Sequence, residues 1–402
     1  MRSALLLVLA LMTAACATVP TPVVVPELPT LGETIDAAVD APPFDRAIWA
    51  ILVEEDDGTV LYARNAAKLA TPASNRKLFA SAAVVACLGA DTRLTTEVWR
   101  SDEDLVIRGD GDPSLGSWRY ERSDDFDRLA QQLAARGVTK VHDVIADVAA
   151  FDRLTIPLGW KHGNIGEDYA APVDALAWGE NEIAGNRAVA DPALHAATAL
   201  RDALFARGID VTGSPRVNTE PRSWDERIAT IPSPFVADLL MAVLKNSHNL
   251  YAEMLLKRLG SQPQATYESA FATEKAFLTS DVGVEGDSFA FVDGSGLAPD
   301  DLVTAESTIR VLRWMNHPAR RSLWWDILAS PAGPGTLRRR ILVLKDRMRG
   351  KTGTINAVNA LSGIVAMPDG RYRYFAAMVN HHLDDGDEAV RILDEIALAV
   401  AR

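Results

Sequence analysis

Three short motifs carry serine, lysine, asparagine and threonine side chains at spacings suited to nucleophilic catalysis. They are Ser74-Asn75-Arg76-Lys77, Ser247-His248-Asn249 and Lys351-Thr352-Gly353, and the patterns S-x-x-K, S-x-N and K-T-G each occur once, in this order. A serine hydroxyl is a weak nucleophile and needs a base within hydrogen-bonding distance. Because residues three apart share one face of a helix, the amine of Lys77 is expected beside the hydroxyl of Ser74. The motifs therefore predict an acyl-transfer site with Ser74 as nucleophile and Lys77 as base.

The second motif is expected in a short connection between two helices. Ser233-Pro234 is typical of an N-cap followed by proline at the first helical position, and an apolar run covers residues 235–244. A second helical pattern covers residues 250–259. In that connection Ser247 would relay a proton between the lysine base and the departing amine, and the amide of Asn249 would hold the substrate backbone.

The third motif is expected on a strand of an antiparallel sheet. Apolar or alternating runs at 357–367 and 372–380 flank a Pro-Asp-Gly turn, and runs at 48–53 and 59–63 flank an Asp-Asp-Gly turn. Both pairs are typical of hairpins. The first motif would begin a largely buried helix over residues 72–89, which opens near a proline and ends at a glycine.

The side chains of the third motif are suited to binding an anionic group. Lys351 would supply positive charge, and the hydroxyls of Thr352 and Thr354 would bind a substrate carboxylate. Gly353 would leave room for a ligand lying against the strand edge. The backbone N–H groups of Thr354 and Ser74 would together form an oxyanion hole.

Beyond the motifs, five further segments support a resemblance to one family. They are RGDGDPSL (108–115), DYAAPVDALAWGEN (168–181), NSHNLYAEML (246–255), DGSGL (293–297) and GTLRRR (335–340). With the motifs, they resemble the low-molecular-mass class C penicillin-binding proteins, the serine D-alanyl-D-alanine carboxypeptidases and endopeptidases also called peptidase family S13. One departure is His248, because aspartate is the commoner residue there in this family.

The resemblance implies a fold and an activity. We expect an α+β protein: a serine β-lactamase/transpeptidase-like domain, with an antiparallel sheet flanked by helices, and an inserted second α+β domain. It also implies cleavage of D-alanyl bonds in peptidoglycan stem peptides through an acyl-enzyme on Ser74, which β-lactam antibiotics would also acylate. No cofactor and no metal are expected.

The long stretch between Ser74 and Ser247 leaves room for the insertion. Short strand patterns and two helical patterns fill residues 93–232, so this range is predicted to be the inserted domain. Residues 43–92 and 233–402 would then form the catalytic domain. Whether the insertion positions a long substrate or only supports the fold is left open.

The N-terminus predicts export. Arg2, an apolar run over 4–12 and small residues before Cys16 are typical of a signal peptide over residues 1–16, of the lipoprotein type. Lipidation of Cys16 and plain cleavage remain alternatives. A proline-rich linker is predicted over 17–42. The protein is therefore expected in the periplasm, with membrane anchoring through Cys16 if that residue is lipidated.

Composition limits the partners. A net charge of −13 over 402 residues argues against nucleic-acid binding, for which a basic surface would be expected. Cys87 is predicted to be a small buried residue of the first-motif helix. The sequence leaves the oligomeric state open.

Two alternative functions remain. A class A β-lactamase would be expected to carry an E-x-x-L-N segment between the second and third motifs, and none occurs between Asn249 and Lys351. A catalytically silent peptidoglycan-binding protein would not need the catalytic side chains, all of which are present.

Overall fold

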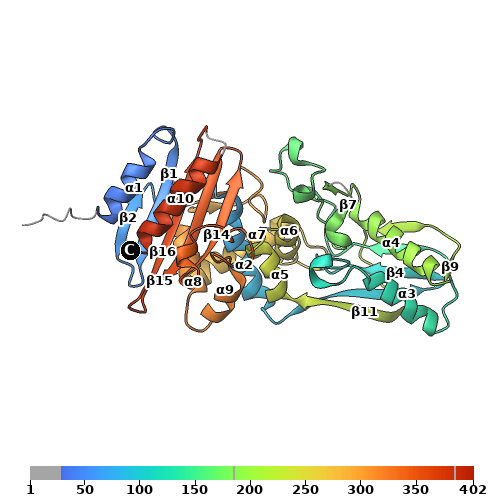
Figure 1. The fold of residues 1–402 in the computed structure, drawn as a ribbon. Helices are drawn as coiled ribbons and strands as arrows, with labels where there is room; N and C mark the ends of the chain where they lie inside the picture. Colours follow the sequence, from blue (N-terminus) through green and yellow to red (C-terminus); the bar gives the residue numbers. More distant parts are fainter. Residues whose placement is uncertain (1–28, 184–185, 384–385) are drawn as a thin grey trace, which may run out of the picture.

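The computed structural model describes residues 29–183, 186–383 and 386–402. The predicted signal peptide (1–16) with Cys16, and residues 17–28 of the predicted linker, lie outside the described residues. The molecule is elongated, with one large sheet toward each end and a group of helices between them (Figure 1).

The sheet that carries the third motif has five antiparallel strands in the order β14-β15-β16-β1-β2. Its strands are β1 (Ile48–Glu55), β2 (Val60–Arg64), β14 (Met348–Ile355), β15 (Val358–Ala366) and β16 (Tyr372–Asn380). Gly58 and Gly370, with φ of 91° and 86°, occupy the two hairpin turns, where left-handed backbone favours glycine. Both predicted hairpins and their union in one sheet are confirmed.

Helices cover both faces of this sheet because alternate residues of its buried strands point to opposite sides. On one side Trp49 and Ile51 pack against α1 (Leu31–Val39) and α10 (Asp387–Val400). On the other, Ala50 and Leu52 belong to the core formed with the remaining helices of this half (Figure 1). Those are α2 (Arg76–Leu88), α5 (Val236–Leu244), α6 (Asn249–Lys257), α7 (Tyr267–Phe277), α8 (Ala305–Met315) and α9 (Arg321–Ile327).

The second large sheet is formed within residues 93–235 and has the strand order β10-β6-β4-β3-β11. Its strands are β3 (Arg93–Ser101), β4 (Asp104–Arg108), β6 (Val144–Asp147), β10 (Pro215–Asn218) and β11 (Glu226–Phe235). It is mixed, because β6 pairs in parallel with β4 and β10, whereas β3 is antiparallel to β4 and β11. Helices α3 (Asp125–Ala135) and α4 (Pro192–Ala206) share its apolar core.

The remaining elements are short. Two-residue strands are β5 (Lys140–Val141), β7 (Glu182–Ile183), β8 (Arg187–Ala188), β9 (Asp210–Val211), β12 (Phe289–Ala290) and β13 (Leu302–Val303). Single helical turns lie at Ala73–Asn75, Trp118–Tyr120, His162–Asn164, Asp168–Ala170, Gly179–Asn181, Leu278–Val282 and Leu342–Leu344.

Three local predictions are wrong. Residues 31–39 of the predicted linker form α1, because Thr30 and Glu33 make a capping box and Ile35 and Val39 are buried. Ser233-Pro234 ends strand β11 instead of capping a helix, and the Ser233 hydroxyl accepts a hydrogen bond from the N–H of Leu94. Cys87 is exposed, because it lies in the last turn of α2, beyond the buried part of that helix.

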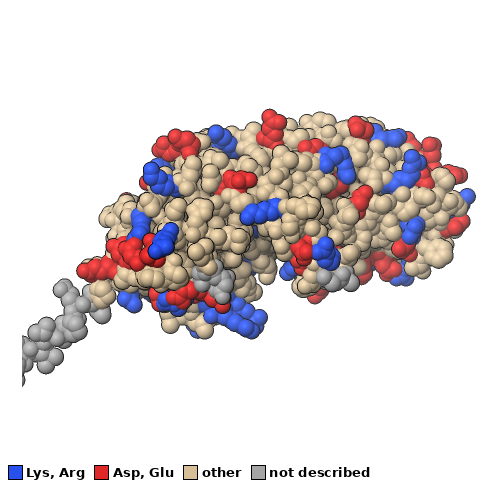
Figure 2. All heavy atoms as spheres, turned by 90° about the horizontal axis from the view of Figure 1, so that it is seen from above, with Lys and Arg blue, Asp and Glu red and all other residues tan. Residues whose placement is uncertain are grey.

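The surface carries both signs of charge. Acidic and basic side chains are interspersed over the face drawn in Figure 2. Within the ranges that the structure describes, no helix is long and apolar enough to cross a membrane.

Candidate active site

The first motif occupies a tight turn that leads into α2. Residues Ala73–Asn75 form one 3₁₀ turn, and the helix follows from Arg76. The Oγ of Ser74 lies 2.8 Å from the Nζ of Lys77, as the helical spacing predicts. Ala73 has a φ of 46°, which is unfavourable for a residue with a side chain. Backbone strain is thus held next to the serine, as is common at functional sites.

Lys77 is fully buried and its Nζ has three oxygen neighbours. They are the Oγ of Ser74 at 2.8 Å, the Oδ1 of Asn249 at 2.6 Å and the carbonyl of Ser295 at 2.6 Å. Burial lowers the pKa of Lys77 to about 7, although the nearby carboxylates of Asp293 and Glu253 act in the opposite direction. A large fraction of Lys77 is therefore neutral near pH 7 and can accept a proton from the serine.

The second motif bridges α5 and α6, and its serine faces a lysine other than the predicted one. Ser247 adopts left-handed backbone, with a φ of 62°. Its Oγ accepts a hydrogen bond from the Nζ of Lys351 at 2.8 Å. The Oδ1 of Asn249 accepts from Lys77, while its Nδ2 donates to the carbonyl of Tyr169 at 2.7 Å.

Lys351 is also fully buried, in the middle of β14. Burial and the nearby charge of Lys77 together hold the pKa of Lys351 well below its usual range. Because the two ammonium groups repel each other in a poorly hydrated site, the arrangement favours a state in which only one lysine carries a proton.

Gly353 has a different role from the one predicted. A Cβ atom at this position would lie 2.7 Å from the carbonyl oxygen of Pro72 and 3.0 Å from the amide nitrogen of Ser74. The missing side chain therefore lets the turn that carries the serine pack directly on β14. The space beside Gly353 is therefore filled by the turn that carries Ser74, and not by a ligand.

The two threonines of the third-motif strand have polar partners. The Oγ1 of Thr352 lies 2.8 Å from the Oγ1 of Thr336, and the Oγ1 of Thr354 accepts a hydrogen bond from Asn359 at 3.1 Å. Thr354 also lines a cavity together with Ser74 and Ser247.

A cavity of about 410 Å³ lies between residues of the first two motifs and the residues that directly follow the third. Its lining includes Ser74, Ser247, Asn249, Thr354, Lys161, Asn164, Tyr169, Gly296, Leu297, Ile355 and Asn356. Residues of the predicted insertion thus face the same space as the motif residues. The cavity is large enough for a small peptide segment to reach the serine.

Sequence reasoning missed a buried ion pair beneath the first motif. The guanidinium of Arg76 makes two hydrogen bonds to the carboxylate of Glu274, at 2.6 and 2.7 Å, and both side chains are fully buried. Its Nε donates to the carbonyl of Asp293 at 2.9 Å. An arginine in a buried helix needs an acidic partner. Because Glu274 lies 198 residues away, the sequence alone does not indicate which acidic residue that partner is.

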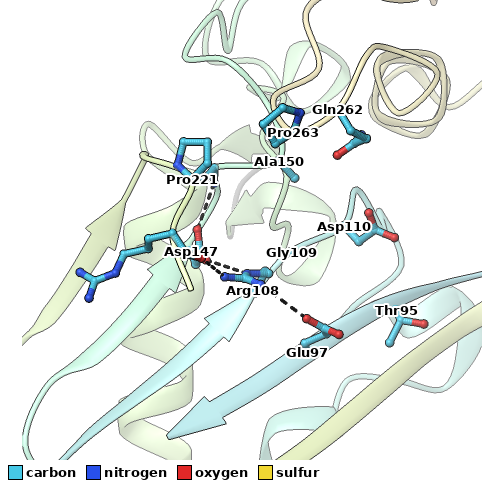
Figure 3. A pocket seen from close by; sticks show the side chains of 12 residues that line it. Thr95, Glu97, Arg108, Gly109, Asp110, Asp147, Ala150, Pro221, Gln262 and Pro263 are labelled. Carbon is cyan, nitrogen blue, oxygen red and sulfur yellow. Dashed lines mark hydrogen bonds and ion pairs between the residues drawn. The ribbon is translucent and has the colours of Figure 1, made fainter. Parts of the chain in front are cut away.

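A second cavity, of about 370 Å³, lies beside the second sheet, and no residue of the three motifs lines it (Figure 3). The Nε of Arg108 donates to Asp147 at 2.8 Å, and an Nη of Arg108 lies 3.8 Å from Glu97. These charges satisfy one another. Among the residues that the structure describes, no serine, cysteine or lysine lines this cavity, so it lacks the pair of nucleophile and base found at Ser74.

Comparison with known proteins gives consistent matches. The profile of the D-Ala-D-Ala carboxypeptidase 3 (S13) family matches residues 31–186 and 180–400. The D-alanyl-D-alanine carboxypeptidase of Actinomadura sp. (strain R39) is 27% identical, over 93% of this chain and 85% of its own. Carboxypeptidase DacB of Mycolicibacterium smegmatis is 30% identical, over 89% of this chain and 81% of its own.

Solved structures show the same fold. Penicillin binding protein 4 (dacB) from Haemophilus influenzae matches with a TM-score of 0.80 at 18% identity, covering 90% of this chain and 97% of that one. Bd3459, a predatory peptidoglycan endopeptidase from Bdellovibrio bacteriovorus, matches with a TM-score of 0.59 at 17% identity, covering 88% and 93%. The predicted α+β, transpeptidase-like fold is confirmed. With the profile match spanning nearly all of the described residues, the chain belongs to the D-Ala-D-Ala carboxypeptidase 3 (S13) family.

Proposed function

We propose that this protein is a serine D-alanyl-D-alanine carboxypeptidase and DD-endopeptidase that acts on peptidoglycan stem peptides through an acyl-enzyme on Ser74. The observation that carries the proposal is the 2.8 Å contact between the Ser74 hydroxyl and the amine of a fully buried Lys77, at the edge of a cavity. Membership of the S13 family supports the choice of substrate.

Acylation begins with proton transfer from Ser74 to the neutral amine of Lys77. The Oγ then bonds to the carbonyl carbon of a D-alanyl peptide bond. Negative charge develops on the carbonyl oxygen, and the N–H groups of Ser74 and Thr354 stabilise it. Lys77 ends this step as an ammonium.

The departing amine needs a proton, and the contact with Ser247 makes Lys351 its source. The anionic carboxylate of the bound substrate beside Lys351 favours the state in which this lysine, and not Lys77, carries the proton. Lys351 passes a proton to the oxygen of Ser247 while the Ser247 hydroxyl gives its own proton to the amine, and the C–N bond breaks. This route differs from the predicted relay from Lys77. It leaves Lys77 charged and Lys351 neutral, so both buried lysines carry a proton only between the attack of Ser74 and the loss of the amine.

Deacylation reverses the roles of the lysines. Water attacks the ester carbonyl and gives a proton, through Ser247, to the neutral Lys351, while Lys77 returns its proton to the departing Oγ of Ser74. β-Lactams acylate the same serine because their strained amide mimics the D-alanyl bond. The positive charge of Lys351 and the hydroxyls of Thr352 and Thr354 bind the carboxylate of either ligand.

Intact-mass measurement after penicillin treatment tests the nucleophile. We expect one covalent adduct per chain in the wild type and none in Ser74→Ala. An adduct on Ser74→Ala would refute the assignment. Rapid turnover of nitrocefin would instead favour a β-lactamase, and a folded wild type without an adduct would favour a silent binding protein.

Digestion of purified sacculi tests the two peptidase activities. Release of free D-alanine reports carboxypeptidase activity, and conversion of cross-linked muropeptides to monomers reports endopeptidase activity. A wild-type protein that takes up penicillin but releases neither product would refute the proposed substrate.

We further propose that residues 43–92 and 233–402 form the catalytic domain and that residues 93–232 form an inserted domain.

We also propose that the protein is exported to the periplasm with a lipid attached to Cys16. The small residues before Cys16 support lipidation. Detergent phase partitioning of the wild type and Cys16→Ala tests it. Equal partitioning into the aqueous phase would contradict lipid attachment.

A further inference from the structure

The middle residue of the second motif is bound to the predicted insertion. The Nε2 of His248 lies 3.0 Å from the Oε2 of Glu180. The His248 side chain is 10% exposed and that of Glu180 is 1% exposed, so solvent barely reaches this contact. His248 stands between Ser247, which contacts Lys351, and Asn249, which contacts Lys77. The contact therefore lies at the residue that separates two active-site side chains.

The glutamate side of this contact is held rigidly. One carboxylate oxygen of Glu180 accepts hydrogen bonds from the Oγ of Ser117 at 2.6 Å and the hydroxyl of Tyr251 at 3.1 Å. The Nε of Arg119 lies 2.9 Å from the same oxygen. Burial alone would raise the pKa of Glu180, but the hydrogen bond and charge of His248, with help from Ser117 and Arg119, lower it to about 2. The carboxylate therefore stays ionised.

Both ends of the contact lie in strained backbone. Gly179, Glu180 and Asn181 have φ of 58°, 61° and 54°, and Ser247 has a φ of 62°. Residues other than glycine rarely adopt these angles, and they persist where surrounding contacts over-determine them. The hydrogen bond between His248 and Glu180 joins the two strained turns directly.

The same groups do not make a convincing metal centre. Ligand atoms of Glu180, Glu182 and His248 lie within 4.8 Å of one another. However, the Oε1 of Glu182 is 4.0 Å from the His248 Nε2, and the Arg119 guanidinium already neutralises Glu180. A hydrogen bond from imidazole to carboxylate uses the geometry as it stands.

We propose that His248 and Glu180 are positioning residues for the second motif. The hydrogen bond from the His248 Nε2–H to the Glu180 carboxylate fixes the turn between α5 and α6. The Ser247 hydroxyl then remains hydrogen-bonded to Lys351, and the Asn249 side chain remains hydrogen-bonded to Lys77. Residues of the predicted insertion are then part of the catalytic apparatus. This inference rests on the proposed acyl-transfer function.

A matched pair of variants tests the contact. In His248→Gln the side-chain amide can donate a hydrogen bond from nearly the same place as the imidazole Nε2, whereas His248→Leu has a similar size and no donor. For each variant of the full chain we would measure the melting temperature, the acylation rate constant for labelled penicillin and the dissociation constant for the same ligand.

We expect His248→Leu to lower the acylation rate constant about 10- to 100-fold, because a displacement of about 1 Å in a catalytic group has an effect of this size. Its dissociation constant should change less than about threefold. His248→Gln should stay within about threefold of the wild-type rate. Acylation of His248→Leu at the wild-type rate would overturn the proposal, as would equal losses in both variants at unchanged melting temperature.

Glu180→Gln gives an independent answer, including the case in which His248→Leu does not fold. It should slow acylation, and adding His248→Leu should slow it little further, because both changes break one contact. Wild-type acylation in Glu180→Gln, or full additivity, would overturn the proposal. Failure of the proposed function itself would look different, because the wild type would then take up no penicillin.

Discussion

Substitution of Gly353 distinguishes between a glycine that makes room for a ligand and one that makes room for the serine turn. In Gly353→Ala the new Cβ would meet the Pro72 carbonyl oxygen at 2.7 Å and the Ser74 amide nitrogen at 3.0 Å. Because both are backbone atoms, the turn and the strand must separate by several tenths of an ångström. Overpacking of this kind destabilises a fold by about 1–3 kcal/mol.

The opposing effect of alanine on the unfolded chain is smaller, about 0.4–1 kcal/mol. We therefore expect the ligand-free melting temperature of Gly353→Ala to fall by a few degrees, since about 1 kcal/mol corresponds to about 2–4 °C in a domain of this size. Displacement of Ser74 by several tenths of an ångström should also lower the acylation rate constant about 10-fold, since about 1 Å would lower it about 100-fold.

The assay combines thermal unfolding without ligand and stopped-flow acylation by labelled penicillin. Gly286→Ala is the control, because its nearest contact for an added Cβ is a lysine side-chain atom at 3.6 Å, an ordinary van der Waals distance. The reasoning would be refuted if Gly353→Ala melted like the control and weakened only penicillin binding, with an unchanged acylation rate constant.

Three further predictions concern the buried charges. Because the pKa of Lys77 is lowered to about 7 and the neutral amine is the base, the acylation rate constant should rise with pH. At pH 6 it should be about one-tenth of its plateau value. An acylation rate constant independent of pH from 6 to 8 would contradict this role. Ser247→Ala should lower peptide turnover about 10²- to 10⁴-fold, measured as D-alanine release, and near-normal turnover would exclude the proton relay. Arg76→Met should lower the free energy of unfolding, measured in urea, by about 3–5 kcal/mol, because it leaves Glu274 buried without its partner. Adding Glu274→Leu should recover part of that loss. A single variant as stable as the wild type would contradict the pairing.

The sequence was sufficient wherever a short-range rule decides the outcome. Helical geometry places residues three apart on one face, so the contact of Lys77 with Ser74 could be predicted from their spacing. Strand periodicity and turn glycines were likewise enough for the hairpins of the first sheet. The same local reasoning was wrong for residues 31–39, where a capping box and two buried side chains make a helix of a segment that its prolines suggested was extended.

Only the tertiary structure decided which distant groups meet. Ser247 could have faced either lysine of the site, and the fold brings the connection between α5 and α6 to Lys351 on β14. Gly353 is required by the turn that carries Ser74, and Glu180 reaches His248 from another part of the chain. Hydrogen bonds and steric contacts depend on separation in space, which the order of residues does not determine for groups so far apart along the chain.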